Sequence, residues 1–383
     1  MAIKKTEIPP LEANERMAPF ARIHDLRVVV RDGWYNAFTD LACWKEMYWL
    51  CYRRGTSHGA GNSVEVVLRS NDLRRWREAE VVESPYGIEG GCAAADGHFC
   101  VTPNRLYLTV GTRNPTHTFV SWTEDGVSWT KPELMRRGDV VPYFWRMRWH
   151  EGRFYSTVNN MEPNAEPWLY LVVSDDAVNW NHHAKIARGL PPGAPNDQDG
   201  YSEESDLLFR ADGELWCVIR TNQAQLYTAE PPYEVWHHRH TMFSGCDAPV
   251  MCETGGEVYL SGRAAASYMG VPSVDGVLPH ALQNPFVFHR KPFSRLGSTG
   301  VYRLRKEGAE LLITMPPAGD ASYAGMISRE AGDLVLSYYS DVAYASGEVR
   351  PRHFPEFVFK ASECDIYLAE VEVGEHPKAI AHP

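Results

Sequence analysis

The sequence lacks several patterns that would assign it to common classes of protein. No stretch approaches the roughly 18 uninterrupted apolar residues of a membrane-spanning helix. The first twenty residues carry basic residues without a following apolar segment, so we expect no export signal. The eight cysteines contain no CxxC pair and mostly lie inside apolar runs. This pattern predicts reduced core thiols in a cytoplasmic protein, without a disulfide scaffold or a zinc site.

Positive charge is also scarce. The 383 residues include 38 Lys and Arg against 49 Asp and Glu, a formal charge of -11. Such a field repels polyanions, so neither nucleic acid nor a membrane surface is expected as a partner. Apolar residues make up 44% of the chain, which is enough for a buried core and excludes a disordered chain.

A repeated turn motif is the strongest positive signal. The pattern [ST]-x-D-x-x-x-W begins at residues 70, 123 and 174, and a looser copy with Glu in place of Asp begins at residue 228. The hydroxyl and carboxylate groups can bond nearby backbone amides in a hairpin turn, over which the Trp packs. The even spacing predicts a structural unit of roughly 55 residues.

Alternating aromatic and β-branched runs accompany these turns, and helical periodicity is nearly absent. Six such runs occur, at residues 47–50, 106–110, 154–158, 215–219, 258–261 and 334–339. Six units with period-two alternation predict an all-β chain that forms one domain, a six-bladed β-propeller.

The expected boundaries follow from this count. We expect residues 1–34 to be an N-terminal extension, 35–373 the propeller and 374–383 a tail. The run at 365–373 is expected to close the ring by pairing with the other end of the chain. Residues 264–300 interrupt the period, and we interpret them as a surface loop, a lid or the contact of a homodimer.

At this point the turns resemble the Asp-boxes of the sialidase (neuraminidase) superfamily, and two longer segments strengthen the resemblance. Residues 201–220 are similar to the sialidase strand pair that opens with a Glu and ends with an Arg, and residues 320–339 to the late hairpin that bears the catalytic Tyr. The resemblance implies Tyr323 as nucleophile and Glu204 as its base. A phenol has a pKa near 10, so a neighbouring carboxylate must take its proton.

Arginines at equivalent strand ends point to an anionic ligand. Arg53, Arg220 and Arg263 each end a run of similar pattern, and Arg146 lies among aromatic residues. In a propeller such strand ends gather around one mouth of the central channel. Planar guanidinium groups can bind a carboxylate with two hydrogen bonds, so we expect these four residues to contact an acidic substrate.

The sequence departs from the sialidase pattern in two places. The early Arg-Ile-Pro is absent, and residues 36–41 stand near its position. The acid/base Asp is replaced by His58, which titrates near neutral pH and can serve the same purpose. Additional site candidates in loops and at the late hairpin are Asp40 as a catalytic carboxylate, and Asp96, Asp320 and Tyr339 as substrate-binding residues.

Histidine-rich segments are interpreted as solvated outer strands. They lie at residues 182–183 and 237–240. They could bind a metal only together with acidic residues, and nothing in their spacing indicates such partners. We therefore expect no metal and no cofactor.

The function expected from these residues is hydrolysis of a glycosidic bond in an acidic oligosaccharide or glycoside. The Tyr/Glu pair would attack, and the arginines would hold the carboxylate of a sialic-acid-like or uronic acid sugar. One alternative is a lyase that cleaves uronates by β-elimination, with His58 or Tyr323 removing the proton next to the carboxylate. A second alternative is a propeller that binds sugars without cleaving them.

Overall fold

The structure is a computed structural model that describes most of the chain. The described residues are 20–59, 61–85, 94–112, 116–159, 168–188, 204–221, 224–242, 246–264, 298–315, 321–330, 332–345, 349 and 363–374. Asp320 and nearly all of the 264–300 interruption lie outside them.

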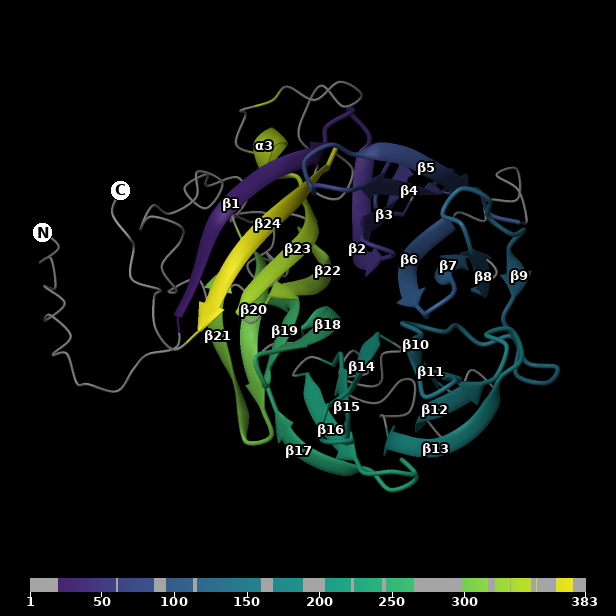
Figure 1. Cartoon of the computed structure of the whole chain (residues 1–383). Coiled ribbons are helices and arrows are strands. Elements are labelled where there is room, and N and C mark those ends of the chain that lie inside the picture. Colours follow the sequence, from purple (N-terminus) through teal and green to yellow (C-terminus); the bar gives the residue numbers. More distant parts are fainter. Residues whose placement is uncertain are drawn as a thin grey trace, which may run out of the picture.

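The described strands form six four-stranded sheets arranged as blades around a central axis (Figure 1). Blade 1 comprises β2 (Tyr35–Trp44), β3 (Met47–Gly55), β4 (Val64–Ser70) and β5 (Arg77–Val82). Blade 2 comprises β6 (Ala94–Val101), β7 (Leu106–Thr112), β8 (Thr118–Thr123) and β9 (Glu133–Leu134). Blade 3 comprises β10 (Arg148–His150), β11 (Arg153–Asn159), β12 (Trp168–Ser174) and β13 (Asn181–Arg188).

The second half of the ring follows the same order from the axis outward. Blade 4 comprises β14 (Ser205–Phe209), β15 (Leu215–Ile219), β16 (Gln225–Ala229) and β17 (His237–Thr241). Blade 5 comprises β18 (Asp247–Thr254), β19 (Glu257–Ala264), β20 (Ser298–Arg305) and β21 (Gly308–Thr314). Blade 6 comprises β22 (Ala321–Glu330), β23 (Asp333–Ser340), β24 (Asp365–Gly374) and β1 (Phe20–Val30). The short helix α3 (Val342–Ala345) follows β23. The expected all-β six-bladed propeller is confirmed.

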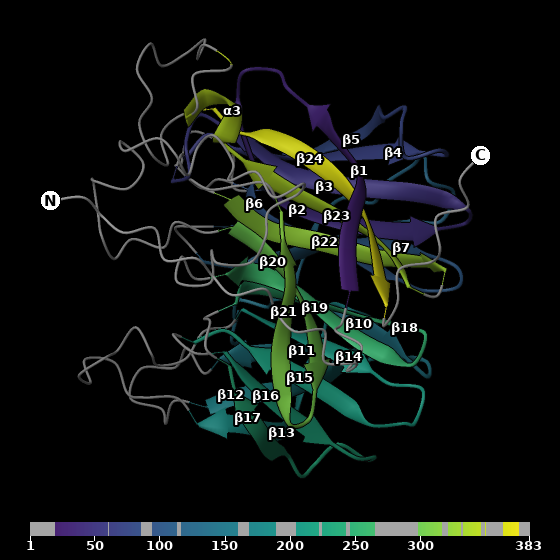
Figure 2. The same cartoon turned by 90° about the vertical axis from the view of Figure 1, so that its left-hand side faces the viewer.

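The two ends of the chain close the ring together. β24 pairs with β23 on one side and with β1 on the other, antiparallel, from Phe20 opposite Gly374 to Val30 opposite Ile366. Figure 2 shows β1 and β24 side by side on the outer edge of the ring. The expected closure through the last strand is therefore confirmed. Its partner β1 lies within residues 1–34, so part of the segment expected to be an N-terminal extension belongs to the propeller as the outer strand of blade 6.

The core lies between the blades. Six clusters of buried apolar side chains lie between neighbouring sheets. Five draw residues from two adjacent blades, and the one between blades 1 and 6 also includes Tyr143, Trp145 and Ala248. The six aromatic and β-branched runs of the sequence are the second strands of the six blades. A strand that packs on both faces needs apolar residues on both, which explains their composition.

The predicted turn motif connects the third and fourth strands of blades 1 to 4. In three copies the carboxylate accepts hydrogen bonds from two backbone N–H groups at 2.7–2.9 Å, namely Asp72 from Arg74 and Arg75, Asp125 from Val127 and Ser128, and Asp176 from Val178 and Asn179. The indole of Trp180 donates back to the carbonyl of Ala177 at 3.0 Å. These bonds stabilise the turn locally, as the residue pattern predicts.

The described cysteines form no disulfide, and five of these seven side chains are buried. No helix among the described residues is long and apolar enough to span a bilayer.

A buried ion pair joins five blades at the axis. Arg146 precedes β10 and is 1% exposed. Its guanidinium donates from Nη1 to Oδ1 of Asp40 on β2 at 2.8 Å, and from Nη2 and Nε to the carbonyls of Ala324 on β22 and Pro249 on β18, at 2.9 and 3.1 Å. The second oxygen of Asp40 accepts the backbone N–H of Phe99 on β6 at 2.8 Å.

A second ion pair includes the remaining blade. Arg148 of β10 binds both carboxylate oxygens of Asp206 on β14, at 2.6 and 2.7 Å. Asp206 also accepts the backbone N–H of Met251 on β18 at 2.7 Å. The two arginines therefore connect all six innermost strands through hydrogen bonds.

Loss of the axial arginine should destabilise the whole ring. We expect Arg146→Met to lower the free energy of unfolding by about 3–5 kcal/mol, because the charge of Asp40 would stay buried without its partner. Denaturant unfolding monitored by Trp fluorescence measures this change.

An exposed ion pair supplies the control. Arg153 binds Asp175 at 2.9 Å, with 44% and 81% of the two side chains exposed. Arg153→Met should change stability by less than about 1 kcal/mol. The double variant Arg146→Met with Asp40→Asn should recover part of the loss. Equal losses in Arg146→Met and Arg153→Met would contradict the role assigned to the axial pair.

Candidate active site

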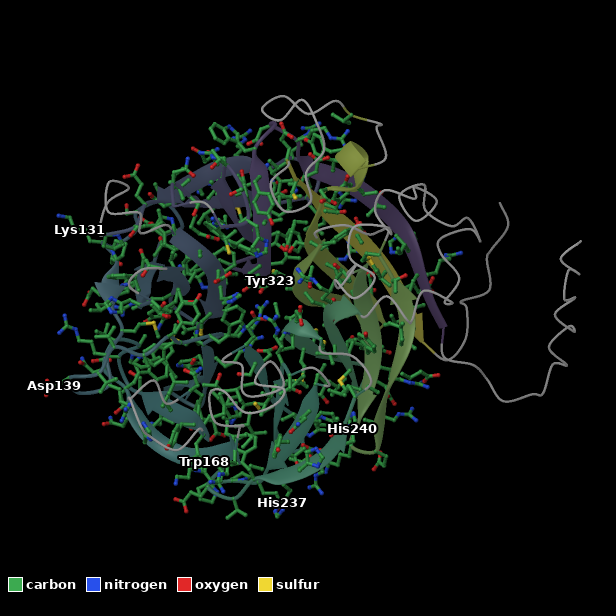
Figure 3. The ribbon with its side chains drawn as sticks, turned by 180° about the vertical axis from the view of Figure 1, so that it is seen from behind. Lys131, Asp139, Trp168, His237, His240 and Tyr323 are labelled. Atoms are coloured by element: carbon green, nitrogen blue, oxygen red, sulfur yellow. The ribbon has the colours of Figure 1, made fainter. Side chains whose placement is uncertain are left out.

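The candidate residues gather at one end of the central channel. Because each blade is antiparallel, its innermost strand begins where its second strand ends, and this end of the ring is called the mouth here. Viewed from behind, Tyr323 lies near the centre of the ring, whereas His237 and His240 lie at its rim (Figure 3).

The same backbone bulge opens four of the innermost strands. Each bulge places two residues of the inner strand opposite one residue of the second strand, and its first residue has a positive φ. These residues are Phe38 (φ 56°), Asp96 (φ 53°), Ala248 (φ 50°) and Tyr323 (φ 46°). Such a conformation is unfavourable for bulky residues, and it is typical of sites where a bulge redirects a side chain.

Tyr323 and Glu204 are in direct contact. The phenol donates to Glu204 Oε1 at 2.8 Å, and the backbone N–H of Ala248 donates to Oε2 at 2.8 Å. Arg220 contacts the same Oε1 as an ion pair. Tyr323 and Glu204 are each 7% exposed. The carboxylate is therefore held from three blades and can accept the phenolic proton.

Burial raises the pKa of the Tyr323 phenol well above its usual value, and the charge of Glu204 raises it further. Arg220 and Arg263 act in the opposite direction. The phenol is therefore neutral at physiological pH, and it becomes a nucleophile only as its proton moves to Glu204.

Two arginines flank this pair, with an aspartate between them. Asp247 Oδ1 lies 3.0 Å from Arg220 Nε, and its Oδ2 lies 3.1 Å from Arg263 Nη1. Arg263 also donates to the carbonyl of Ala321 at 2.9 Å and to the hydroxyl of Tyr339 at 3.2 Å. The Arg220 side chain is 24% exposed and the Arg263 side chain 8% exposed. Asp247 thus fixes the orientation of both guanidinium groups.

Three expected site residues lie away from the open part of the mouth. Asp40 and Arg146 form the buried axial ion pair described above. Arg53 is 0% exposed and donates to the carbonyl of His58 at 2.6 Å. In this structure these three buried side chains bind other parts of the protein and stabilise the scaffold.

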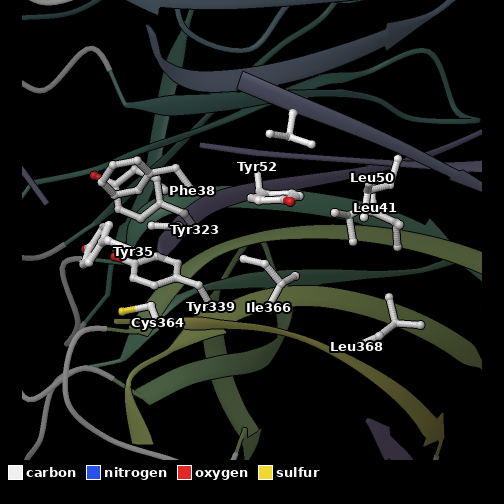
Figure 4. Packing of buried hydrophobic residues seen from close by; sticks show 14 of the residues in the cluster. Tyr35, Phe38, Leu41, Leu50, Tyr52, Tyr323, Tyr339, Cys364, Ile366 and Leu368 are labelled. Carbon is white, nitrogen blue, oxygen red and sulfur yellow. The ribbon is translucent and has the colours of Figure 1, made fainter. Parts of the chain in front are cut away.

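His58 lies on an aromatic wall at one side of the mouth. Its Nδ1 is 2.8 Å from the hydroxyl of Tyr35, and its ring packs edge-on against Phe38 with ring centres 5.1 Å apart. The ring centre of Phe38 also lies 4.6 Å from that of Tyr323 and 5.6 Å from that of Tyr339. Figure 4 shows Tyr35, Phe38, Tyr323 and Tyr339 packed together. Tyr339 is 0% exposed, and its hydroxyl accepts a hydrogen bond from Arg263 within the protein interior.

Asp96 lies on the side of the mouth that blade 2 forms. It is 8% exposed, and its Oδ2 accepts a hydrogen bond from the hydroxyl of Tyr143 at 2.7 Å. Its charge contributes to the raised pKa of Tyr323, and Asp96 begins the bulge of blade 2 as Tyr323 begins that of blade 6.

The histidine-rich segments lie on β13 and β17, the outermost strands of their blades. The imidazole of His183 lies 2.7 Å from the carbonyl of Pro232, and that of His240 lies 3.2 Å from the carbonyl of Lys306. Among the described residues, no group of three or more His, Cys, Asp or Glu side chains is placed to hold a metal ion.

Several residues of the mouth were not found from the sequence. Asp247, Tyr35, Phe38 and Tyr143 occur in no motif. The bulges align Phe38, Asp96, Ala248 and Tyr323 at one structural position, yet these four residues share no chemical type. Only the repeat period could have located that position in advance.

Comparisons with known proteins show the fold. No family model and no curated protein matches the chain. A Dyadobacter fermentans protein of unknown function superimposes with a TM-score of 0.66 at 15% identity, over 93% of this chain and 100% of that one. Trypanosoma rangeli sialidase superimposes with a TM-score of 0.60 at 11% identity, over 88% of this chain. The phage phi92 endosialidase gives 0.59 at 10% identity, over 94% of this chain and 70% of that one.

These likenesses show that the propeller is of the sialidase type. The chain spans 55% of the length of Trypanosoma rangeli sialidase. At such identities the comparison establishes architecture, and it carries no substrate or activity across.

Ionisation of Tyr323 should be suppressed in the folded protein. We expect the tyrosinate absorbance of the wild type and of Tyr323→Phe to agree up to about pH 10, the usual pKa of tyrosine. A phenol with a raised pKa contributes stability below the unfolded value, and that contribution is lost as the pH rises towards the folded value. Wild type should therefore lose more stability than Tyr323→Phe between pH 9 and about pH 11.

Glu204→Gln provides the comparison, because it removes the carboxylate that helps to suppress the ionisation. In this variant the extra tyrosinate should appear at lower pH than in wild type. A Tyr323 signal that develops well below pH 10 in wild type would show that the phenol is not shielded as described.

Proposed function

We propose that this chain is a glycosidase that cleaves a glycoside of an acidic sugar with retention of anomeric configuration. The observation that carries the proposal is the 2.8 Å hydrogen bond from the Tyr323 phenol to Glu204, in a mouth that also presents Arg220. A buried neutral phenol with a carboxylate acceptor is suited to attack an anomeric carbon that already bears a negative group.

In the first step the Tyr323 oxygen forms a bond to the anomeric carbon while the bond to the leaving oxygen breaks. The phenolic proton passes to Glu204, and a group at the mouth gives a proton to the leaving oxygen. His58 and Asp96 both border the mouth and are the candidates for this donor. In the second step water attacks the anomeric carbon, the donor takes a proton from that water, and Tyr323 recovers its proton from Glu204.

Arg220 and Arg263 would hold the carboxylate of the sugar. Burial lowers the pKa of Arg220, but Glu204, Tyr323 and Asp247 outweigh this effect, so the pKa lies above its usual value and the cation persists at any working pH. Because Asp247 holds both guanidinium groups, they need little reorganisation when a carboxylate binds.

A screen of sialic-acid-like and uronic acid glycosides tests the function. We expect release of reducing ends without a rise in near-ultraviolet absorbance, which a lyase product with a conjugated double bond would cause. Tyr323→Phe should lower kcat by about 10³-fold or more, because it removes the nucleophile. Tyr107→Phe on β7, outside the mouth, should keep wild-type activity and serves as the matched control.

The same screen separates the alternatives. Ultraviolet-absorbing products would favour the uronate lyase, and binding without turnover would favour a sugar-binding propeller. Full activity of Tyr323→Phe would refute the assignment of the nucleophile.

The arginine assignment makes a separate prediction. Arg220→Lys should raise KM for acidic glycosides about tenfold or more, because lysine cannot reproduce the paired hydrogen bonds of the guanidinium group. Arg210→Lys, on the blade 4 turn away from the mouth, should leave KM unchanged. Efficient turnover of neutral glycosides alone would contradict an acidic substrate.

A further inference from the structure

A second carboxyl group lies behind Asp96. Glu65 is on β4 of blade 1 and is 0% exposed. Neither of its carboxylate oxygens has a nitrogen or oxygen hydrogen-bond partner among the described residues, and the neighbouring polar group is the Cys51 thiol, which lowers the pKa of Glu65. Its Oε1 lies against the backbone of Gly97, since a Cβ placed on that glycine would come within 2.1 Å of it. The buried carboxyl group is therefore packed against the residue that follows Asp96.

The bulge of blade 2 places Asp96 directly before the glycine against which the Glu65 carboxyl group packs. Asp96 is the first residue of that bulge, and Gly97, the second, leaves the space that the Glu65 side chain occupies. Tyr143 donates to one oxygen of Asp96, and the other oxygen has no hydrogen-bond partner among the described residues. Both carboxyl groups are thus buried, and Asp96 occupies the position at the mouth in blade 2 that Tyr323 occupies in blade 6.

The charged and titratable groups around this pair come from several strands. Arg53 and Cys51 on β3, Asp40 on β2 and Asp96 on β6 face Glu65. Tyr143 and Tyr323 face Asp96. Burial raises the pKa of Glu65 well above its usual value, Asp96 raises it further, and Arg53 opposes them. The net direction favours a protonated Glu65.

Two carboxyl groups in one poorly solvated site do not both ionise readily. The first proton leaves easily, whereas loss of the second would leave two negative charges side by side. The protons then belong to the pair, which holds one of them over a wide range of pH.

We propose that Glu65 and Asp96 share one proton at neutral pH, and that Asp96 delivers it to the leaving oxygen of the glycoside. This inference rests on the glycosidase function proposed above. Delivery breaks the O–H bond of the carboxyl group and forms the O–H bond of the departing alcohol, leaving both carboxylates ionised. Their mutual repulsion then makes Asp96 an effective base for the water of the second step, and that proton restores the pair.

The geometry favours Asp96 over His58 as the donor. Asp96 is the first residue of the blade 2 bulge, the position that Tyr323 holds in blade 6, and its charge raises the pKa of the Tyr323 phenol. His58 has its Nδ1 at 2.8 Å from Tyr35 and packs on Phe38. Asp96 is therefore the catalytic residue in this proposal, and Glu65 is a positioning residue that acts through it.

Kinetics against pH test the pair. In Glu65→Gln the remaining carboxyl group holds its proton less tightly, so the alkaline limb of kcat/KM should move down by about one pH unit or more. Activity on the acidic side of the profile should stay near wild type. Asp96→Asn should lower kcat about 10²-fold or more for alkyl glycosides, and much less for aryl glycosides whose leaving group needs no proton.

Controls separate this effect from a loss of structure. Glu78→Gln removes a carboxyl group from β5 of the same blade, where the side chain is 55% exposed, and should leave the pH profile unchanged. Glu65→Leu removes the carboxyl group without adding an amide, and it should move the alkaline limb in the same direction as Glu65→Gln. An unchanged limb in both Glu65 variants, or a leaving-group dependence in His58→Gln in place of Asp96→Asn, would overturn the proposal.

Infrared difference spectroscopy tests the shared proton without any turnover. At neutral pH the wild type should show the C=O stretch of a protonated carboxyl group, and Glu65→Gln should lack it. In Asp96→Asn the band should persist, with its midpoint at lower pH because a neighbouring charge is gone. A wild type without the band, or a midpoint unaffected by Asp96→Asn, would refute the pair even if the glycosidase activity were found. If no glycoside were cleaved but the band behaved as described, the proposed function would fail and the shared proton would stand.

Discussion

The buried ion pair between Arg146 and Asp40 is the constraint on which the rest of this structure depends. Removing two charges from water is unfavourable unless each finds a full set of partners. Here the remaining donors and acceptors of the pair bind backbone groups of β6, β18 and β22. The pair therefore sets how closely the innermost strands of five blades approach the axis, and the Arg148–Asp206 pair does the same for β14.

The site at the mouth follows from this arrangement. Glu204, Asp247, Tyr323 and Asp96 come from four different blades, and the bonds from Tyr323 to Glu204, from Arg220 to Asp247 and from Tyr143 to Asp96 all join separate parts of the ring. In two of the bulges the second residue binds the axial arginine through its carbonyl, Pro249 after Ala248 and Ala324 after Tyr323. A positive φ at a tyrosine persists only where the surroundings hold it. The rigid axis thus supports the strained backbone that presents the phenol to Glu204.

Part of the site could be predicted from the sequence and part could not. The Tyr323 and Glu204 segments resemble a known pair, and the structure brings them into contact. The sequence pattern predicts the same role for Arg53, Arg220 and Arg263, because each ends a similar run. In the structure Arg220 and Arg263 reach the mouth, whereas Arg53 is enclosed. Arg53 and Arg263 hold the same position in their blades, opposite the residue before the bulge, so the difference comes from their neighbours, the carbonyl of His58 for Arg53 and Asp247 for Arg263. Asp247 and Glu65 lie in no motif, because their importance comes from neighbours on other blades.

The sequence by itself determined the number of blades, the second strand of each blade and the hydrogen-bonded turns of blades 1 to 4. These features arise from local hydrogen bonds and from apolar alternation within a few residues, which a repeat makes visible. Only the tertiary structure decided which charged side chains are buried at the axis and which surround the mouth. Asp40 and Arg146 are 106 residues apart in the chain. Their pairing depends on desolvation, and desolvation is set by the blades that surround a charge and not by the residues beside it in the sequence.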